Sequence, residues 1–293
     1  MKCGFIAIAG APNAGKSTLL NRILGFKLAI VSNKPQTTRH RILGVHTQDE
    51  AQMIFLDTPG LHQARGALNR RMMDVALESL READALLMVV DASGKGLELG
   101  RKAASLAVRS DKPALLALNK IDVFGEKQRL LPILQQAEQW GQWQALVPVS
   151  ARSGEGVERL LGELVRLLPE SPPMFPADTL TDLSERFLAA ELVREKVFRF
   201  TRQDIPYASA VTIDEFVEPG RHPVTAISAT IHVERESQKA IIIGKNGSML
   251  KTLGTAARQD LERMLGGPVF LKLLVRVEPR WSHDGAGLSK LGY

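Results

Sequence analysis

The sequence predicts two domains of different class: an α/β domain whose mostly parallel sheet carries helices on both faces, and a smaller α+β domain after it. Two patterns predict this order. Short apolar segments alternate with amphipathic ones from residue 4 to about residue 168, and a proline-rich segment then precedes a different succession of elements. The length of 293 residues agrees with two domains, since one domain usually takes about 100–200 residues.

Five near-continuous apolar segments are the expected strands of the first domain, because strands buried on both faces have this composition. They span residues 4–10, 52–58, 84–92, 113–120 and 145–151. Residues 39–49 instead alternate apolar and polar side chains, which predicts an edge strand paired antiparallel with the next strand. The expected helices are Ser17–Leu24, Leu68–Ala83, Leu97–Arg109, Arg129–Gln139 and Gly156–Leu167.

The second domain begins after residues 169–178, which hold four prolines and predict a stiff linker. The elements then follow in the order α-β-β-α-α-β. They are expected at Leu183–Phe200, Ala208–Val217, Thr225–Glu234, Ser237–Ile243, Ser248–Leu265 and Pro268–Glu278. We therefore divide the chain into a first domain at 1–170, a linker at 171–182, a second domain at 183–280 and a flexible tail at 281–293.

Composition predicts a soluble, cytoplasmic protein. The only cysteine is Cys3, which excludes an internal disulfide. We expect no signal peptide, and no apolar run approaches the roughly 20 residues that span a bilayer. The net charge of +6 favours an anionic partner only weakly, but residues 239–280 contain eight basic and three acidic side chains. A solvated basic face explains that cluster equally well.

Residues 10–18, GAPNAGKST, match a phosphate-binding loop and lie between an expected strand and an expected helix. Backbone amides and the positive end of the helix dipole favour phosphate there. Lys16 is expected to reach the β- and γ-phosphates. The predicted nucleotide ligands of this loop are Asn13, Ala14, Gly15, Lys16, Ser17 and Thr18.

Three further motifs, each after an expected strand, predict that the nucleotide is GTP or GDP. Asp122 of the NKID motif accepts two hydrogen bonds from guanine, and adenine would leave this carboxylate unpaired. In the DTPG motif, the amide of Gly60 is placed to contact the γ-phosphate. The predicted ligands are Asp57, Thr58 and Gly60, then Asn119, Lys120 and Asp122, and finally Ser150, Ala151 and Arg152 of the SAR motif.

The predicted metal site holds Mg²⁺ through Ser17, Asp57 and a threonine of the polar segment 32–41. We favour Thr38 over Thr37 as the switch residue that completes the coordination. For GTP hydrolysis we expect the catalytic contributions from Lys16, Thr38 and Gly60.

The second domain contains the G-x-x-G sequence of RNA-binding KH domains at 244–247, between two expected helices. The order α-β-β-α-α-β matches a type II KH fold. The predicted RNA ligands are Ile243, Gly244, Lys245, Asn246, Gly247, Ser248, Lys251, Phe270 and Lys272. Residues 241–243 line either an RNA groove or the plain core, and Arg280 and Trp281 are weaker candidates for RNA contact.

Taken together, GAPNAGKS, the TTR of residues 37–39, DTPG, NKID and SAR resemble the translation-factor-related bacterial GTPases. The stretches 189–216 and 229–251 are similar to the Era family within that group, and the resemblance covers the whole chain. It implies a GTP-regulated factor that binds 16S ribosomal RNA near its 3′ end and assists assembly of the 30S subunit.

The same resemblance bears on hydrolysis. Leu61 stands where Ras-like enzymes place a water-positioning glutamine, which implies slow intrinsic turnover. Asn13 matches an asparagine that binds a monovalent cation in potassium-activated relatives, so K⁺ is a candidate cofactor; Asn13 alternatively only shapes the loop. His62 and Arg65 lie nearby, and we assign them no catalytic role.

A second hypothesis is a membrane-peripheral GTP sensor whose basic surface meets acidic lipid or whose second domain binds a protein. The sequence has no lipidation signal and no strongly amphipathic basic helix, which favours the RNA hypothesis. We expect a monomer.

Overall fold

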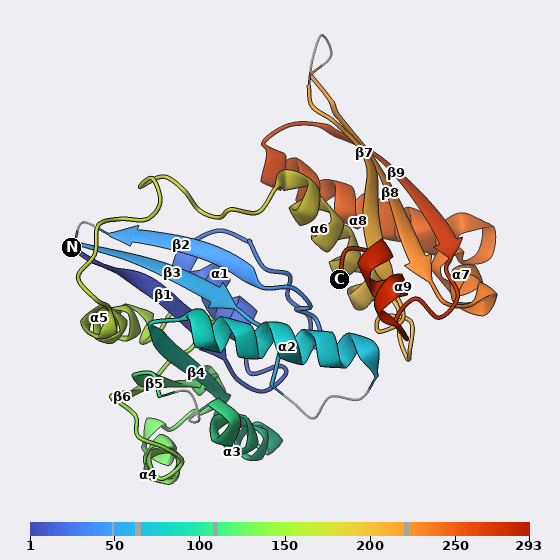
Figure 1. Ribbon diagram of the computed structural model, residues 1–293. Coiled ribbons are helices and arrows are strands. Elements are labelled where there is room, and N and C mark those ends of the chain that lie inside the picture. Colours follow the sequence, from blue (N-terminus) through green and yellow to red (C-terminus); the bar gives the residue numbers. More distant parts are fainter. Residues whose placement is uncertain (49, 62–65, 108–110, 220–222) are drawn as a thin grey trace. The chain divides into compact units, whose positions relative to one another are not determined.

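A computed structural model describes residues 1–48, 50–61, 66–107, 111–219 and 223–293. The chain forms two compact units (Figure 1). The first consists of Met1–Arg65 and Asn69–Asp182, and the second of Gly66–Leu68 and Leu183–Tyr293. Within the described residues, no helix has the length and apolar character needed to cross a membrane.

The first unit is built on a six-stranded sheet in the order β2-β3-β1-β4-β5-β6. Its strands are β1 (Lys2–Ala9), β2 (Ile42–Gln48), β3 (Ala51–Asp57), β4 (Ala85–Asp91), β5 (Ala114–Asn119) and β6 (Ala145–Pro148). As predicted, β2 is an edge strand antiparallel to β3, and the other pairs are parallel. The carboxyl ends of the parallel strands therefore share one edge of the sheet, where ligands bind in such folds.

Helices cover both faces of this sheet. They are α1 (Lys16–Leu24), α2 (Ala67–Glu82), α3 (Lys95–Ala107), α4 (Leu130–Glu138) and α5 (Val157–Leu167). Buried residues of α2, α3 and α4 form one core with alternate residues of β1, β4 and β5, such as Ala7, Met88 and Leu116. The opposite face carries fully buried Ile6 and Leu87, and α1 and α5 contact strands of this sheet. Each predicted helix of this domain is present; the predicted end of α3 at Arg109 lies outside the described residues.

The proline-rich segment predicted as a linker packs onto the first unit. The fully buried side chain of Gln52 accepts hydrogen bonds from the amides of Met174 (2.7 Å) and Phe175 (2.9 Å) and donates one to the Phe175 carbonyl (2.8 Å). Further on, the Leu180 carbonyl accepts a 2.8 Å bond from the Val45 amide on the edge strand β2. The segment thus continues the first unit up to about residue 182.

The second unit has a three-stranded sheet in the order β7-β8-β9. β7 and β8 are antiparallel, and β8 and β9 are parallel. Its elements are α6 (Glu185–Phe200), β7 (Ala210–Val217), β8 (Thr225–Val233), α7 (Glu236–Ile243), α8 (Ser248–Leu265), β9 (Val269–Val277) and α9 (Gly285–Lys290). Buried residues of α6, α7 and α8, including Val197, Ile242 and Leu253, share one core with Ile231 of β8. The succession from α6 to β9 is that of a type II KH domain, as predicted.

The expectation of a flexible tail at 281–293 is wrong. Trp281 is only 2% exposed, and its indole nitrogen donates a 3.0 Å hydrogen bond to the carbonyl of Ala208. Its ring stacks on Tyr293, and Leu288 of α9 is buried. Glycine and serine content alone therefore misled the prediction, because the buried side chains of Trp281, Leu288 and Leu291 anchor this segment on the second unit. The burial also removes Trp281 from the candidates for RNA contact.

Candidate functional site

The phosphate loop of residues 10–18 connects β1 to α1, as the sequence predicts. Gly15, directly before α1, has φ +96°, and a Cβ there would lie 2.2 Å from the side-chain nitrogen of Asn119. Only glycine meets both requirements. The Lys16 ammonium donates hydrogen bonds to the carbonyls of Gly10 (3.2 Å) and Ala11 (3.1 Å), which curls the loop around it.

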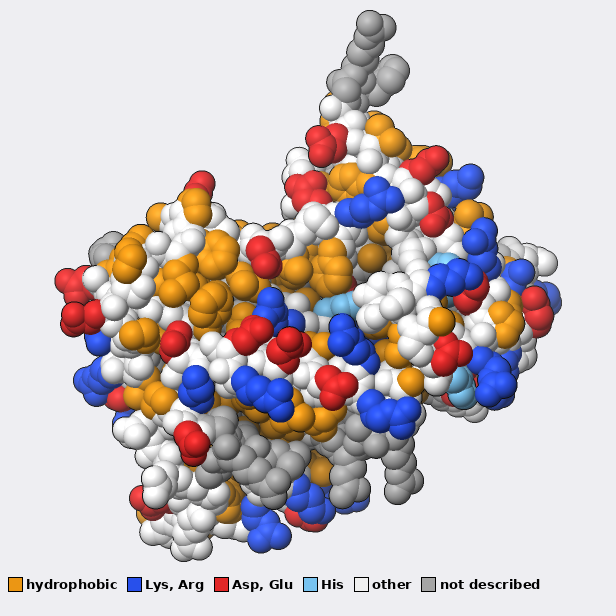
Figure 2. All heavy atoms as spheres, in the orientation of Figure 1, with side chains coloured by type: hydrophobic (Ala, Val, Ile, Leu, Met, Phe, Trp, Pro, Cys, Tyr) orange, Lys and Arg blue, Asp and Glu red, His pale blue; other side chains and the backbone are white. Residues whose placement is uncertain are grey.

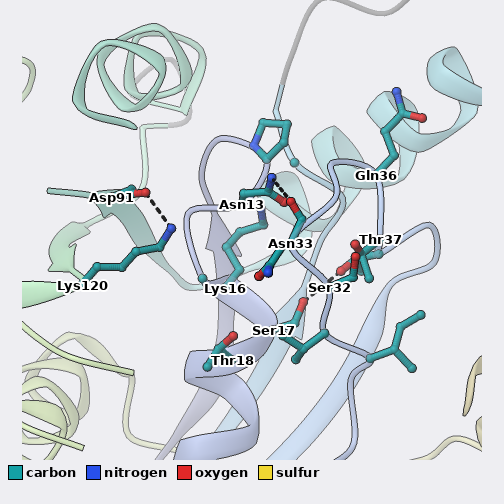
Figure 3. Close-up of a pocket in the computed structure, with 16 residues that line it drawn as sticks. Asn13, Lys16, Ser17, Thr18, Ser32, Asn33, Gln36, Thr37, Asp91 and Lys120 are labelled. Carbon is teal, nitrogen blue, oxygen red and sulfur yellow. Dashed lines mark hydrogen bonds and ion pairs between the residues drawn. The ribbon is translucent and has the colours of Figure 1, made fainter. Parts of the chain in front are cut away.

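A cavity of about 480 Å³ opens above this loop. Figure 3 shows its walls: the phosphate loop with Lys16 and Ser17, the polar segment 32–41 (the switch segment) with Ser32 and Thr37, and a third wall made by Asp91 and Lys120. Thr38 of the switch segment lines the cavity as well. Asn13, Gly15, Thr18 and Gly60 also line it. The positive end of α1 and the Lys16 ammonium make the floor of this cavity suited to an anion.

The three predicted metal ligands lie together. Ser17 Oγ donates a 2.6 Å hydrogen bond to Asp57 Oδ2. Because the Ser17 hydroxyl has only one hydrogen, the Thr38 hydroxyl is the donor in its 2.9 Å hydrogen bond with Ser17 Oγ. Thr37 instead donates to the carbonyl of Lys34 at 2.8 Å. This arrangement agrees with the preference for Thr38 over Thr37.

Burial shifts the pKa values of the two charged residues at this cluster, Asp57 and Lys16, toward their neutral forms. Burial raises the pKa of Asp57 to about 6, although the nearby Lys16 ammonium and the Ser17 hydroxyl oppose the rise. Burial likewise lowers the pKa of Lys16 to about 8, with Asp57 opposing it. Asp57 Oδ1 is buried without a hydrogen-bond partner among the described residues. A spare carboxylate oxygen beside two hydroxyls is a donor set that suits Mg²⁺, which prefers oxygen ligands.

The DTPG motif leads from β3 back to the phosphate loop. Gly60 lies against Pro12 with no room for a side chain, and the Leu61 amide donates a 3.0 Å bond to the Gly10 carbonyl. The Leu61 side chain is 3% exposed and belongs to the core of the first unit. Thr58 is fully buried and donates its hydroxyl to the carbonyl of Ile8 at 2.9 Å, away from the cavity. His62 and Arg65 lie outside the described residues.

The NKID and SAR motifs are joined by direct hydrogen bonds. Ser150 Oγ donates to Asp122 Oδ1 at 2.7 Å. Asn119 Nδ2 donates to the carbonyl of Ala14 at 2.8 Å, and its Oδ1 accepts the amide of Ala151 at 2.9 Å. Asn119 therefore ties the phosphate loop to the last motif of the site.

Two side chains outside the motifs complete this region. Arg22 of α1 donates hydrogen bonds to the carbonyls of Ala151, at 3.2 Å, and of Arg152. Asp91, at the end of β4, forms an ion pair with Lys120 at 2.6 Å. Sequence reasoning missed both, since neither lies within a motif; the only available signal was the position of Asp91 at the end of a predicted strand.

Asn13 bears on the predicted monovalent cation. It has a positive φ of 61°, and its side-chain nitrogen donates a 3.0 Å bond to the carbonyl of Asn33 in the switch segment. This hydrogen bond, drawn as a dashed line in Figure 3, joins the phosphate loop to the segment that holds Asn33.

The G-x-x-G loop of the second unit joins α7 to α8. Gly244 has φ +72°, and a Cβ there would meet the backbone nitrogen of Met249 at 2.8 Å. A groove of about 400 Å³ begins beside the loop. It is lined by Gly247, Leu250, Lys251, Gly254, Thr255, Arg258, Leu271 and Leu273. Of the predicted RNA ligands, Gly247 and Lys251 line this groove, while Lys245, Asn246 and Ser248 are exposed on or next to the loop.

Phe270 and Lys272 do not line the groove with the other predicted RNA ligands. Successive side chains of a strand point to opposite faces of a sheet. Because Leu271 and Leu273 line the groove, Phe270 and Lys272 are directed to the other face of β9, where Phe270 is 63% exposed. Among the three isoleucines, Ile242 is fully buried core, Ile243 is half-buried and Ile241 is exposed.

Figure 2 shows basic and acidic side chains interspersed over the visible face of each unit, without a continuous field of one sign. Because the charges are mixed, the ligand of each site is better inferred from its shape and its own side chains than from the net charge of the protein.

These geometries define a class: the chain is a P-loop GTPase that carries a KH domain. Comparison with family models agrees, since residues 5–120 match a model described as 50S ribosome-binding GTPase and residues 204–282 match the KH domain. The chain belongs to the Era family of GTPases. It is 48% identical over 292 residues to GTPase Era of Geobacter metallireducens, covering 100% of this chain and 98% of that one. With GTPase Era of Stenotrophomonas maltophilia the identity is 47%, covering 99% and 97%.

Two solved Era structures are similar over the full length. One is Aquifex aeolicus Era, as a variant bound to GDP·AlF4⁻, and the other is Era in complex with MgGDPNP and nucleotides 1506–1542 of 16S ribosomal RNA. Each is 41% identical, has a TM-score of 0.93, and is matched over 100% of this chain and 99% of its own.

Proposed function

We propose that this GTPase is a nucleotide-controlled switch that binds 16S ribosomal RNA near its 3′ end and assists assembly of the 30S subunit. The observation that carries the proposal is the full-length similarity, at a TM-score of 0.93, to an Era structure holding both a GTP analogue and that RNA. The cavity above the phosphate loop and the groove beside the G-x-x-G loop offer one site for each ligand.

For the nucleotide, Lys16 would release the two loop carbonyls it now contacts and bind the β- and γ-phosphates. Ser17, Thr38 and Asp57 would hold Mg²⁺, which supplies neutralisation of phosphate charge when bound. The amide of Gly60 would contact the γ-phosphate. Removal of that phosphate frees Gly60 and Thr38, which is the usual basis of a GTP switch.

For the base, Asp122 would accept the two guanine N–H groups, with Ser150 holding the carboxylate in place. The pairing requires a guanine edge, because adenine presents no matching donors. The two hydrogen bonds that Asn119 makes, to Ala14 and to Ala151, would keep the base pocket and the phosphate loop at a fixed separation.

For hydrolysis, the buried Leu61 side chain offers no group that orients water. We infer that K⁺ takes part, held by the side-chain oxygen of Asn13 and by the Asn33 carbonyl. The 3.0 Å hydrogen bond from Asn13 Nδ2 to that carbonyl brings the two residues together and would open when the cation binds. A cation held by these residues would supply positive charge to the phosphates, as an arginine does in other GTPases. Hydrolysis in potassium chloride should then exceed hydrolysis in sodium chloride at equal ionic strength, and equal rates would remove the cation from the mechanism.

For RNA, the proposed ligands are the G-x-x-G loop and its flanks, Ile243, Lys245, Asn246 and Ser248, together with Lys251. Bases would lie on Leu271 and Leu273, and the lysines would face phosphate. Phe270 and Lys272 would contact RNA only if the RNA extends around to the other face of the β-sheet.

We further infer a cytoplasmic monomer. A membrane-peripheral fraction would need a basic surface for acidic lipid, and flotation with vesicles containing phosphatidylserine tests it directly.

The proposed function is tested by RNA binding. A 16S 3′-end fragment is titrated with the full chain in the presence of GDP or a non-hydrolysable GTP analogue, across a salt series. We expect tighter binding with the analogue, and loss of binding in Gly244→Asp with GTP hydrolysis intact. Equal binding of the Gly244→Asp variant would place the RNA site elsewhere, and equal binding with both nucleotides would remove the switch.

A further inference from the structure

Asp91 is an acidic side chain on the wall of a cavity that receives an anionic ligand. It is the last residue of β4, in register with Asn119 of the parallel neighbour β5. A carboxylate facing a phosphate site raises the cost of binding unless a cation neutralises it. That cation is Lys120, whose ammonium lies 2.6 Å from Asp91 Oδ2, as the dashed line in Figure 3 shows.

The Asp91 side chain is held from a second side. Its other oxygen, Oδ1, accepts hydrogen bonds from the amide of Ser93 at 2.8 Å and from the Ser93 hydroxyl at 2.6 Å. The backbone of Gly96 approaches so closely that a Cβ there would lie 2.6 Å from Asp91 Cγ. With 15% of its side chain exposed, Asp91 is a fixed anchor, whereas its partner Lys120 is 36% exposed.

The ion pair limits the freedom of the Lys120 side chain. Its backbone is left-handed, with φ 67°, a conformation rare for a long side chain. A free lysine also has many rotamers to lose when a ligand packs on its stem. Pairing the ammonium in advance removes that cost before the ligand arrives.

We propose that Asp91 is a positioning residue for nucleotide binding, which anchors the Lys120 ammonium and so fixes the Lys120 stem as a wall of the base site. The proposal rests on the assignment of Asp122, two residues further along, to the guanine edge. A lysine stem buries its methylene groups against a flat apolar surface. It therefore supports the face of any purine, while Asp122 reads the edge of guanine.

A purely structural role for Asp91 would act through Ser93, and one substitution separates the two roles. Asp91→Asn keeps an oxygen that accepts both Ser93 hydrogen bonds but removes the charge that holds Lys120. Lys120→Met keeps an apolar stem without the ammonium. Glu98→Gln is the matched control, since Glu98 also forms a carboxylate–lysine pair, with Lys102 at 2.7 Å, on the exposed surface of α3.

The experiment measures equilibrium binding of GDP and IDP to the full-length variants. We expect Asp91→Asn to weaken both ligands about fivefold, the size of a good partly exposed ion pair. The GDP-to-IDP ratio should stay at the wild-type value, because the exocyclic amine is read by Asp122. The double variant with Lys120→Met should bind no more weakly than Lys120→Met alone, and Glu98→Gln should bind as wild type.

Three results would overturn the proposal. The first is unchanged GDP affinity in Asp91→Asn. The second is a loss in the double variant equal to the product of the single losses, which would mean that the two residues act independently. The third is an unfolding temperature of nucleotide-free Asp91→Asn that lies well below that of Lys120→Met, which loses the same ion pair, because the excess would indicate a structural role through Ser93. Failure of the underlying base assignment is distinct: the wild-type chain would then bind ADP as well as GDP.

Discussion

The nucleotide site and the groove beside the G-x-x-G loop, the proposed RNA site, are built from different numbers of chain segments. In the nucleotide site, residues from five loops are interlocked: Asn119 alone bonds to Ala14 of the phosphate loop and to Ala151, more than a hundred and about thirty positions away respectively. The groove beside the G-x-x-G loop is lined by one loop, one helix and one strand that follow each other between residues 247 and 273.

The difference follows from what each site must recognise. A nucleotide is small and must be enclosed, so donors have to converge from several strand ends at fixed distances. A single-stranded RNA is long and binds along an open surface by stacking and phosphate contact. Single substitutions should therefore lower affinity strongly in the nucleotide site, and each should lower RNA affinity only slightly in the groove.

The largest effect is expected from Trp281→Ala, which tests whether the C-terminal segment belongs to the second unit. Removing this buried ring should cost about 3–5 kcal/mol of the free energy of unfolding. In calorimetry of the full chain, the unfolding of the second unit should move to lower temperature while GDP affinity stays unchanged. An unchanged unfolding temperature of the second unit would indicate that residues 281–293 do not contribute to its stability.

Gly15→Ala is expected to abolish tight nucleotide binding, with GDP affinity falling by at least about 100-fold, since it adds backbone strain and a clash with Asn119. Its control is Gly162→Ala on the exposed side of α5, where a Cβ meets nothing within 4 Å. That control should keep affinity and gain about 0.5–1 kcal/mol of stability. Similar affinity in both variants would contradict the enclosed phosphate loop.

Asp122→Asn is expected to lower GDP affinity about 10–100-fold, the value of hydrogen bonds to a charged group, and to favour xanthosine diphosphate. Competition binding of the two nucleotides measures the change. An unaltered order of preference would refute the assignment of the base pocket, while leaving the phosphate loop untouched.

The smallest effect is a pH dependence of Mg²⁺-assisted binding. The pKa of Asp57 is raised to about 6 by burial. Protonation removes the anionic ligand, so affinity for Mg²⁺·GDP should be constant above this value and fall as pH drops through it. Between pH 7 and pH 5 the ionised fraction of Asp57 falls about tenfold, and affinity should follow. Asp57→Asn should bind weakly and without this pH dependence; a wild-type profile flat to pH 5 would exclude Asp57 as the titrating ligand.

The same pKa change also affects stability without nucleotide. Because the native pKa of Asp57 exceeds the ordinary value of 3.8, the native state binds more protons than the unfolded state between the two values. Stability of the nucleotide-free chain should therefore decline as pH rises from about 4 to about 6. The burial that would serve Mg²⁺ binding by Asp57 is thus expected to cost stability in the nucleotide-free chain.

Much of the first unit was predictable because its signals are local. Each parallel strand is a short apolar run, and each motif follows one of them, so the shared edge of the sheet brings the motifs together. The alternation in residues 39–49 likewise identified the edge strand β2. The period of two in β9 was also available, and applying it would have separated Phe270 and Lys272 from the groove.

Other features were not local. The buried α6 carries ion pairs, such as Arg194 with Glu191 at 2.6 Å, where charged residues suggest an exposed face. Arg22 reaches carbonyls 129 and 130 residues away. No periodicity or motif encodes such contacts, since they depend on how separate elements pack.

The sequence by itself determined the order of the elements from β1 to β9, the ligands GTP and GDP, and the identity of the G-x-x-G loop, because propensity, period and motif spacing act over a few residues. Only the tertiary structure decided that Arg22 reaches the carbonyls of Ala151 and Arg152, that Asp91 pairs with Lys120, and that residues 281–293 fold onto the KH domain. Each of these depends on the distance between atoms far apart in the chain, and that distance exists only after the core has packed.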